Sequence, residues 1–172
     1  MTGAIQDYAR WNAVKADLRG RDLARAQLQL ANLAGAQLQG ADLREADARG
    51  AIFDLADLTG ANLTGALLQG AQFRRATLRR VSLRQALLLG AHLEQADICA
   101  ADLTGANLEW AWVDGVDFQE VVVTCALFLN ARGLTDEACH MVEAGGGFTG
   151  TRPMILGREL YETRPSQDTE DA

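Results

Sequence analysis

The chain has 172 residues, a formal net charge of −7, 48% hydrophobic residues and only 6% aromatic residues. This length suits one domain with a buried core, and the scarcity of aromatic rings requires a core of alanine and leucine. No apolar run approaches the roughly 18 residues of a membrane span, and no basic stretch leads into an apolar one at the start, so a cytoplasmic protein is expected. Cys99, Cys125 and Cys139 form no CxxC pair, which argues against a disulfide framework and against a zinc site.

Residues 1–15 precede the first regular pattern of the chain. Ile5, Tyr8, Trp11 and Val14 recur there at helical spacing. The sequence therefore predicts a short amphipathic helix that forms an N-terminal cap.

Residues 16–130 consist of 23 consecutive pentads. The first position is Ala in 19 of them, the third is Leu in 15, and the second is usually Asp, Asn or Gln. Five residues advance an α-helix by about 500°, which would scatter the leucines around a rod, so a long helix is excluded. On an extended backbone, however, the first and third residues point to one side and the second to the other. Each pentad is therefore interpreted as one short strand followed by a corner, and Gly at the fifth position in ten pentads suits such corners.

The tandem A(D/N)LXX pattern of residues 16–130 resembles the pentapeptide-repeat proteins. The resemblance implies an all-β fold, a right-handed quadrilateral parallel β-helix with four pentads per coil and short helical caps. Alanine and leucine are then expected inside, with Leu58 stacked between Leu38 and Leu78, twenty residues away on either side. At about 4.8 Å per coil, the rod is expected to be roughly 28 Å long.

Residues 131–161 are predicted to form a C-terminal cap helix with an extension, because the pentad register ends at Ala131. Thr135 suits a helix N-cap, acidic residues follow it, and Gly145 to Gly147 suit the end of the helix. Residues 162–172 are polar and acidic, which predicts a disordered tail.

Two surface features stand out once the pentads are assigned to four faces. One is an apolar stripe, a possible dimer or partner surface, of Leu67, Leu87, Leu89, Trp110, Leu127 and Leu129. The other is a belt of five arginines, a possible site for an anion or an acidic partner: Arg74, Arg75, Arg79, Arg80 and Arg84. Their alternative interpretations are a stripe covered by residues 148–161, and arginines that belong to ordinary solvated charge ladders.

The sequence contains no catalytic, metal-binding or cofactor-binding motif, so we expect a non-enzymatic protein without a cofactor. Two function classes remain open. The first is a scaffold that binds a protein partner or a second copy of itself. The second is a DNA-mimicking, gyrase-binding protein of the kind that the family resemblance implies. Residues 1–130 carry 12 basic and 15 acidic side chains, so the rod lacks the dense negative charge of a DNA mimic. Direct nucleic-acid binding is not expected either.

Overall fold

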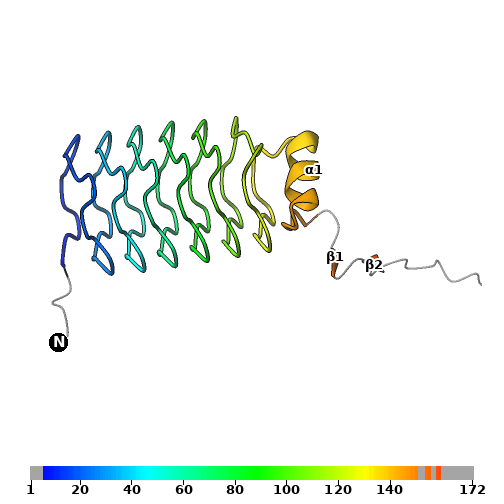
Figure 1. The fold of residues 1–172 in the computed structure, drawn as a ribbon, viewed down its shortest axis with the longest axis horizontal. Coiled ribbons are helices and arrows are strands. Elements are labelled where there is room, and N and C mark those ends of the chain that lie inside the picture. The colour runs from blue at the N-terminus through cyan, green and yellow to red at the C-terminus, as the bar shows by residue number, and fades with distance from the viewer. Residues whose placement is uncertain (1–5, 151–153, 156–157, 160–172) are drawn as a thin grey trace, which may run out of the picture.

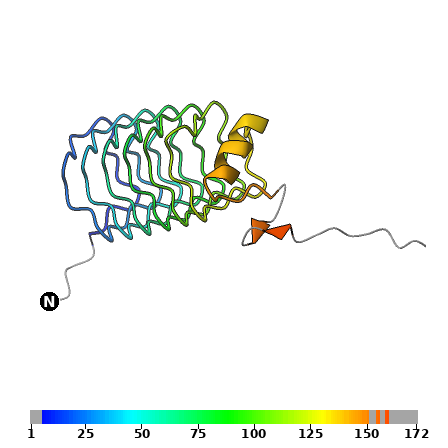
Figure 2. The same ribbon diagram turned by 45° about the vertical axis from the view of Figure 1, so that its right-hand side comes forward.

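The computed structural model describes residues 6–150, 154–155 and 158–159 of the chain. Residues 6–135 wind into a four-sided rod of stacked coils, and a helix closes its C-terminal end (Figures 1 and 2). With one exception in residues 6–130, second-position residues twenty apart form a parallel bridge, for example Gln37 with Asp57 and Asp57 with Thr77. Four pentads therefore complete each coil, as predicted, and Leu58 lies between Leu38 and Leu78.

Each side of the rod is one column of pentads, and we name the four sides by where their pentads begin. Face A consists of the pentads that begin at 16, 36, 56, 76, 96 and 116, and face B of those that begin at 21, 41, 61, 81, 101 and 121. Face C consists of the pentads that begin at 6, 26, 46, 66, 86, 106 and 126. Face D consists of those that begin at 11, 31, 51, 71, 91 and 111.

The interior is filled by the first and third residues of the pentads. Leu58, Leu78 and Ala76 are at most 1% exposed, and Phe53 and Phe73 stack flat on one another with their ring centroids 4.9 Å apart. Every fifth residue from Arg10 to Asn130 has a positive φ, and 15 of these 25 residues are not glycine. The corner geometry is thus imposed by the fold even on side chains that disfavour it.

The second position is polar in most pentads, and there its side chain accepts a local hydrogen bond. The carboxylate of Asp57 accepts from the backbone N–H of Thr59 at 2.9 Å, and Asn62 does the same for Thr64 at 3.0 Å. Aspartate and asparagine side chains form such turns readily. Each of these bonds fixes the backbone just before a corner.

The N-terminal end differs from its sequence prediction. Residues 6–15 form two further pentads, in which Asp7 pairs with Gln27 and Asn12 with Asn32, so the predicted helix is wrong for this segment. The rings of Tyr8 and Trp11 stack with their centroids 5.0 Å apart and pack against the core. Among residues 6–15, two aromatic side chains rather than a helix therefore cover this end of the rod. Residues 1–5, which include Ile5, lie outside the described residues.

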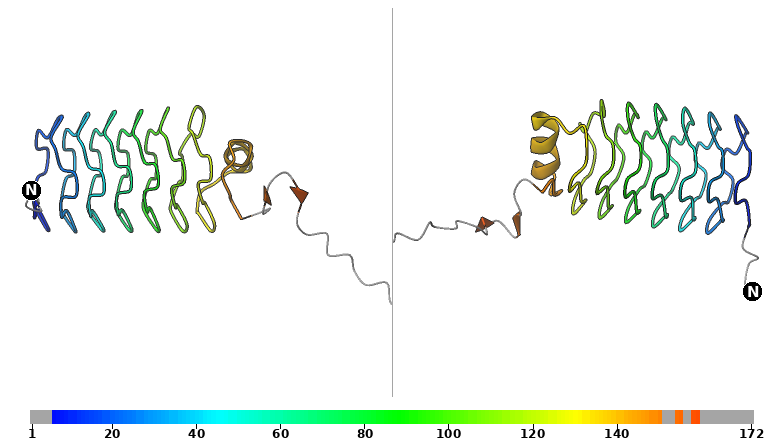
Figure 3. Two further views of the ribbon diagram at one scale, coloured as in Figure 1. Left: turned by 60° about the horizontal axis from the view of Figure 1, so that its bottom comes forward. Right: turned by 180° about the vertical axis from the view of Figure 1, so that it is seen from behind.

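The C-terminal end is covered by α1 (Asp136–Ala144), which lies across the last coil (Figures 1 and 3). The hydroxyl of Thr135 accepts from the backbone N–H of Ala138 at 3.2 Å and caps the helix, while Ala138 and Val142 are buried. Beyond the rod, β1 (Met154–Ile155) pairs antiparallel with β2 (Arg158–Glu159). The predicted tail, residues 162–172, lies outside the described residues. In the described ranges, no helix combines the length and apolarity needed to span a membrane.

Candidate functional site: surfaces of the rod

Face C carries the predicted apolar stripe. Leu67 bridges Leu87, which places these residues directly above one another. Leu87 is 39% exposed and Leu89 is 42% exposed, although the backbone of this strand is hydrogen-bonded to the coils on both sides, for example from Leu88 to Asn107 at 2.7 Å. Since the strand is rigid and the side chains point outward, these leucines form a flat apolar surface.

The stripe continues past one polar coil. Asn107 and Glu109 occupy the next pentad of face C, and Leu127 and Leu129 follow in the coil beyond. Trp110, at the corner of the polar coil, is 52% exposed, and its backbone N–H donates to the carbonyl of Leu129 at 3.0 Å. All six residues of the predicted stripe therefore lie on face C or at its edge.

Phe148 belongs to the segment 148–161, which is the alternative cover of the stripe, and it forms the next rung of face C. It pairs with Leu127, so it takes the place that strict counting in twenties assigns to Gly147. The offset arises because the segment with α1 takes the place of two pentads but is one residue longer than they would be. The repeat pattern contains no signal for this shift. We define the face C patch as Leu67, Leu87, Leu89, Trp110, Leu127, Leu129 and Phe148.

The five arginines of the predicted belt lie on faces D, A and B and at the corners between them. Most of these guanidinium groups are already bound to side chains of the next coil. Arg79 pairs with Asp97 at 2.5 Å and Arg84 with Asp102 at 2.8 Å, and Arg75 donates to Gln95 at 2.8 Å. The hydrogen bond that the guanidinium donates to the carboxylate of Asp97 raises the pKa of Arg79, which stays charged.

Arg74 belongs to a column of polar and aromatic groups on face D. Its guanidinium lies 3.4 Å from Glu94 and 2.9 Å from the Nδ1 atom of His92. The His92 ring stacks on Trp112 with centroids 5.7 Å apart. The guanidinium of Arg132 lies over the Trp112 ring, 4.4 Å from its centroid. Burial raises the pKa of Glu94, but hydrogen bonds from its own backbone and from His92 outweigh this, so the net shift is downward. The belt thus consists mainly of paired charges and offers little free positive charge to an anion.

Face A contains the one interruption of the ladder in residues 6–130. Asp97 and Asp117 occupy equivalent places in neighbouring coils, yet no bridge joins them. In the other rungs of this face, backbone N–H groups such as those of Leu78 and Arg80 donate to the next coil at 2.7 and 3.0 Å. The equivalent N–H of Ile98 has no acceptor among the described residues.

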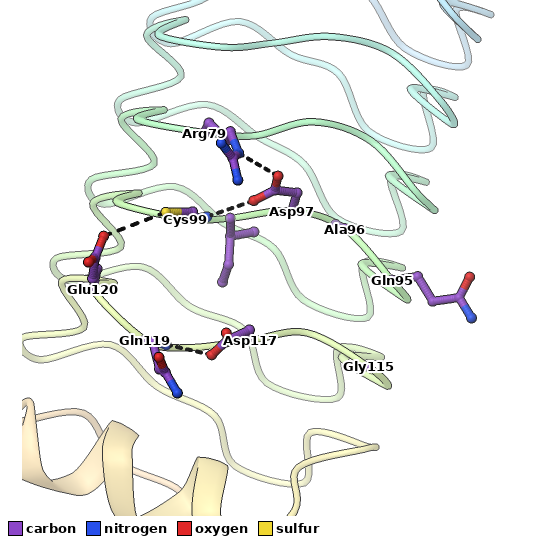
Figure 4. Close-up of a pocket in the computed structure, with 10 residues that line it drawn as sticks. Arg79, Gln95, Ala96, Asp97, Cys99, Gly115, Asp117, Gln119 and Glu120 are labelled. Atoms are coloured by element: carbon purple, nitrogen blue, oxygen red, sulfur yellow. Dashed lines mark hydrogen bonds and ion pairs between the residues drawn. The ribbon is translucent and has the colours of Figure 1, made fainter.

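A cavity of about 450 Å³ fills the opening between these two strands. Figure 4 shows Arg79, Asp97 and Cys99 on one side of it and Asp117 and Glu120 on the other. The thiol of Cys99 donates to the carboxylate of Glu120 across the gap at 3.6 Å. A second cavity, of about 350 Å³, separates residues 116–119 from α1. This segment is therefore held by its corners and its core side chains rather than by ladder bonds.

Phe118 is the core side chain that anchors the loose segment. It is 4% exposed and packs edge-to-face against Phe128, with centroids 5.4 Å apart. Val116 and Val121, on either side, are only partly buried, unlike the alanines that occupy most first positions. The sequence gives no direct signal for the opening, because Val81 is also a first-position valine and lies in an intact rung.

The described residues contain no group of three or more His, Cys, Asp or Glu side chains that could hold a metal ion. Where acidic side chains stack, as Asp22 does with Asp42, they stand along a straight ladder. Such a ladder does not direct six oxygens to one point.

The protein-family model of pentapeptide repeats matches the chain in eight copies, over residues 14–50, 41–80, 56–93 and 82–120. Among solved structures, a pentapeptide-repeat protein from the thylakoid lumen of Arabidopsis thaliana is 31% identical, with a TM-score of 0.62. That match covers 72% of this chain and 83% of the other. HetL, a pentapeptide-repeat protein involved in regulating heterocyst differentiation in the cyanobacterium Nostoc sp. strain PCC 7120, is 26% identical, with a TM-score of 0.51. That match covers 73% of this chain and 69% of HetL.

A search of curated proteins found no significant match. The similar solved structures are right-handed quadrilateral β-helices, like the rod described above. Because the family model covers well over half of the chain and the four-sided coils are its characteristic fold, the chain belongs to the pentapeptide-repeat family.

Proposed function

We propose that this protein is a non-enzymatic scaffold that binds another protein surface through the face C patch. The observation that carries the proposal is the exposure of Leu87, Leu89 and Trp110 on one flat side of a rigid rod. Patches of this kind on monomeric chains mark association surfaces. The other faces mostly present polar side chains that are hydrogen-bonded to their neighbours.

The rigidity of the rod supports this role. Neighbouring coils of face C are joined by hydrogen bonds, such as those from Leu68 to Leu87 at 2.8 Å and from Leu87 to Ala66 at 3.0 Å. A surface that is already ordered loses little conformational entropy when it binds. The preferred partner is therefore a flat apolar protein surface rather than a ligand that needs a deep pocket.

The expected cytoplasmic location stays a prediction, because one of the similar solved structures is that of a thylakoid-lumen protein. We do not carry the roles stated for the similar proteins over to this chain. Its surface, and not the shared fold, determines what it binds.

An affinity pull-down with paired variants tests the proposal. Leu87→Lys combined with Leu89→Lys places two charges on the patch and should abolish capture of a specific partner. Ile52→Lys is the matched control, because Ile52 is a partly buried apolar residue that points outward from face D. Circular dichroism must show the same spectrum for all proteins. Equal capture by the wild type and the double variant would refute a binding role for the patch.

A further inference from the structure

The two outward positions of each pentad on face C carry side chains that suit one another. Leu87 stands beside Leu89, Leu127 beside Leu129, and Asn107 beside Glu109. Nearer the N-terminus, Asp47 and Arg49 form an ion pair at 2.6 Å. Gln27 stands beside Gln29, and the exception is Leu67, which stands beside Gln69.

Face D shows that this matching is not general. There, Ile52 stands beside Asp54, and Trp112 beside Asp114, so an apolar side chain shares the pentad with a carboxylate. Ion pairs within one pentad also occur on face A, between Asp17 and Arg19, and on face B, between Asp42 and Arg44. Among the described pentads, face C is the face that combines such polar pairs with pentads in which both outward side chains are leucine.

This pattern determines how face C can pair with face C of a second copy. If two copies meet through face C around a two-fold axis parallel to the rods, each coil faces the same coil of the other copy. The axis also reverses the strand direction, so the second position of a pentad faces the fourth position of its counterpart. From this match we infer that face C is the interface of a parallel, two-fold symmetric homodimer. The inference rests on the proposed function, and names a second copy of this chain as the partner.

Each coil of face C then meets a suitable surface. Leu87 packs against Leu89 of the second copy, and Leu127 against its Leu129. The amide of Asn107 donates to the Glu109 carboxylate of the second copy, a charge-assisted hydrogen bond. The ion pair of Asp47 and Arg49 becomes a four-charge cluster of alternating sign across the axis.

The bulky corner residue also finds space in this arrangement. Trp110 faces the corner formed by Gly105 and Ala106 of the second copy. A Cβ atom at Gly105 would meet only the side chain of Gln85, at 3.6 Å, so this corner is open on its outer side. An indole can therefore lie over it without displacing backbone.

The opposite, antiparallel arrangement fits less well. A two-fold axis across the coil of Asn107 would also bring Leu87 against Leu127 of the second copy. It would, however, place Glu109 against its own symmetry mate, and leave Asp47 and Arg49 beyond the end of the other rod. Like charges in direct apposition are unfavourable, so the parallel arrangement is preferred.

The size of face C limits the strength of the dimer. Seven pentads are separated by six spacings of about 4.8 Å, which gives a face roughly 29 Å long and one short strand wide. Such a face buries on the order of 1,000 Å² in total, at the lower end for a specific interface. We therefore expect a reversible dimer whose population depends on protein concentration.

Sedimentation velocity with mixed charge variants tests both the surface and its orientation. The wild type should dimerise with increasing concentration, and so should the control Ile52→Lys. Leu87→Lys alone and Leu89→Glu alone should each raise the dissociation constant at least about tenfold, because each buries unpaired charges. An equimolar mixture of these two variants should recover dimers, because one lysine then faces one glutamate.

Mixing Leu87→Lys with Leu127→Glu provides the orientation control. Recovery in this mixture, but not in the first, would overturn the parallel arrangement in favour of the antiparallel one. A wild type that stays monomeric at every concentration, also after removal of residues 151–172, would overturn the homodimer. The proposed scaffold function would survive that result if the patch variants still lost a different protein partner. Dimers that form only after the removal would show that this segment covers face C, and would overturn the homodimer as the state of the full chain.

Discussion

Asp97 and Asp117 are separated by one turn of the rod, and between them the ladder of backbone hydrogen bonds is open. The backbone N–H of Asp97 donates to Ala76 in the preceding coil at 3.0 Å, whereas the N–H of Asp117 has no acceptor among the described residues. The segment that contains Asp117 has a cavity on each side. Face A is therefore continuous from its first coil to Asp97 and loose beyond it.

Amide hydrogen exchange should reveal this opening. The N–H groups of Ile98 and Ala100 should exchange faster than those of Leu78 and Arg80, which hold the same places one coil earlier and donate to Asp97 and Cys99. Buried and hydrogen-bonded amides exchange only when the structure opens. Exchange measured by NMR, residue by residue, makes the comparison within one sample. Equal protection in both coils would show that the ladder is closed in solution.

Substitution by alanine should lower the free energy of unfolding by very different amounts at two glycines that both have a positive φ. At Gly133, a Cβ atom would lie 2.5 Å from the backbone nitrogen of Asp114, and φ is +87°. Gly133→Ala should therefore lower the free energy of unfolding by about 2 to 4 kcal/mol. At Gly60, by contrast, nothing lies within 4 Å of the added atom, and φ is +66°.

Gly60→Ala is thus the control, with an expected loss of about 1 kcal/mol from the left-handed backbone alone. Urea unfolding of both variants measures the difference. Equal losses would mean that the close approach of Gly133 to Asp114 does not contribute.

Acid should destabilise the rod through its second-position aspartates. Hydrogen bonds from Arg49 lower the pKa of Asp47; burial opposes this shift, and Gln29 reinforces it. A carboxylate whose pKa is depressed by folding stabilises the native state when the pH is above the pKa of the unfolded chain, which is near 3.9. That contribution is lost as the pH falls through the pKa of the folded state. The free energy of unfolding should therefore decrease as the pH falls from about 5 to 2.

Asp47→Asn should flatten part of this pH dependence and cost about 1 kcal/mol at pH 7. Asn62→Ala is the control, because it removes an uncharged acceptor from Thr64, and its cost should be the same at every pH. A wild-type stability that does not change with acid would contradict the prediction.

DNA gyrase is not expected to be inhibited by this protein. The described rod has no unbroken acidic surface, because arginines such as Arg79 and Arg84 pair with the carboxylates of Asp97 and Asp102. A DNA mimic needs dense, unpaired negative charge. A supercoiling assay with the purified protein should show no inhibition at micromolar concentration. Inhibition that disappears when Asp97, Asp102 and Asp117 are neutralised would show that local acidic density is sufficient.

Most of the rod could be predicted from sequence because each residue has one role set by its place in the pentad. Leu58 is buried and Leu87 is exposed for the same reason: the first is a third-position and the second a second-position residue. The pentads of residues 6–15 were missed because Tyr8 and Trp11 replace the usual leucine and alanine. These residues close the end of a stack, where a large ring covers more core than a small side chain.

The remaining differences arise where packing between distant residues decides the outcome. The loose segment around Asp117 depends on how Phe118, Val116 and α1 share the last coil. Phe148 joins the face C patch because the helix shifts the register by one residue. Neither effect is visible in a pattern that repeats every five residues.

Pairing at intervals of twenty residues also determines which insertions and deletions the rod tolerates. Removing twenty residues shortens the rod by one coil and leaves every later side chain on its face. Removing five turns all later coils by a quarter of a revolution. Such a deletion between Leu67 and Leu87 would carry Leu87, Leu89, Leu127 and Leu129 to a different side from Leu67. The length of this chain can therefore change freely only in units of a coil, while any smaller change divides its apolar surface between two faces.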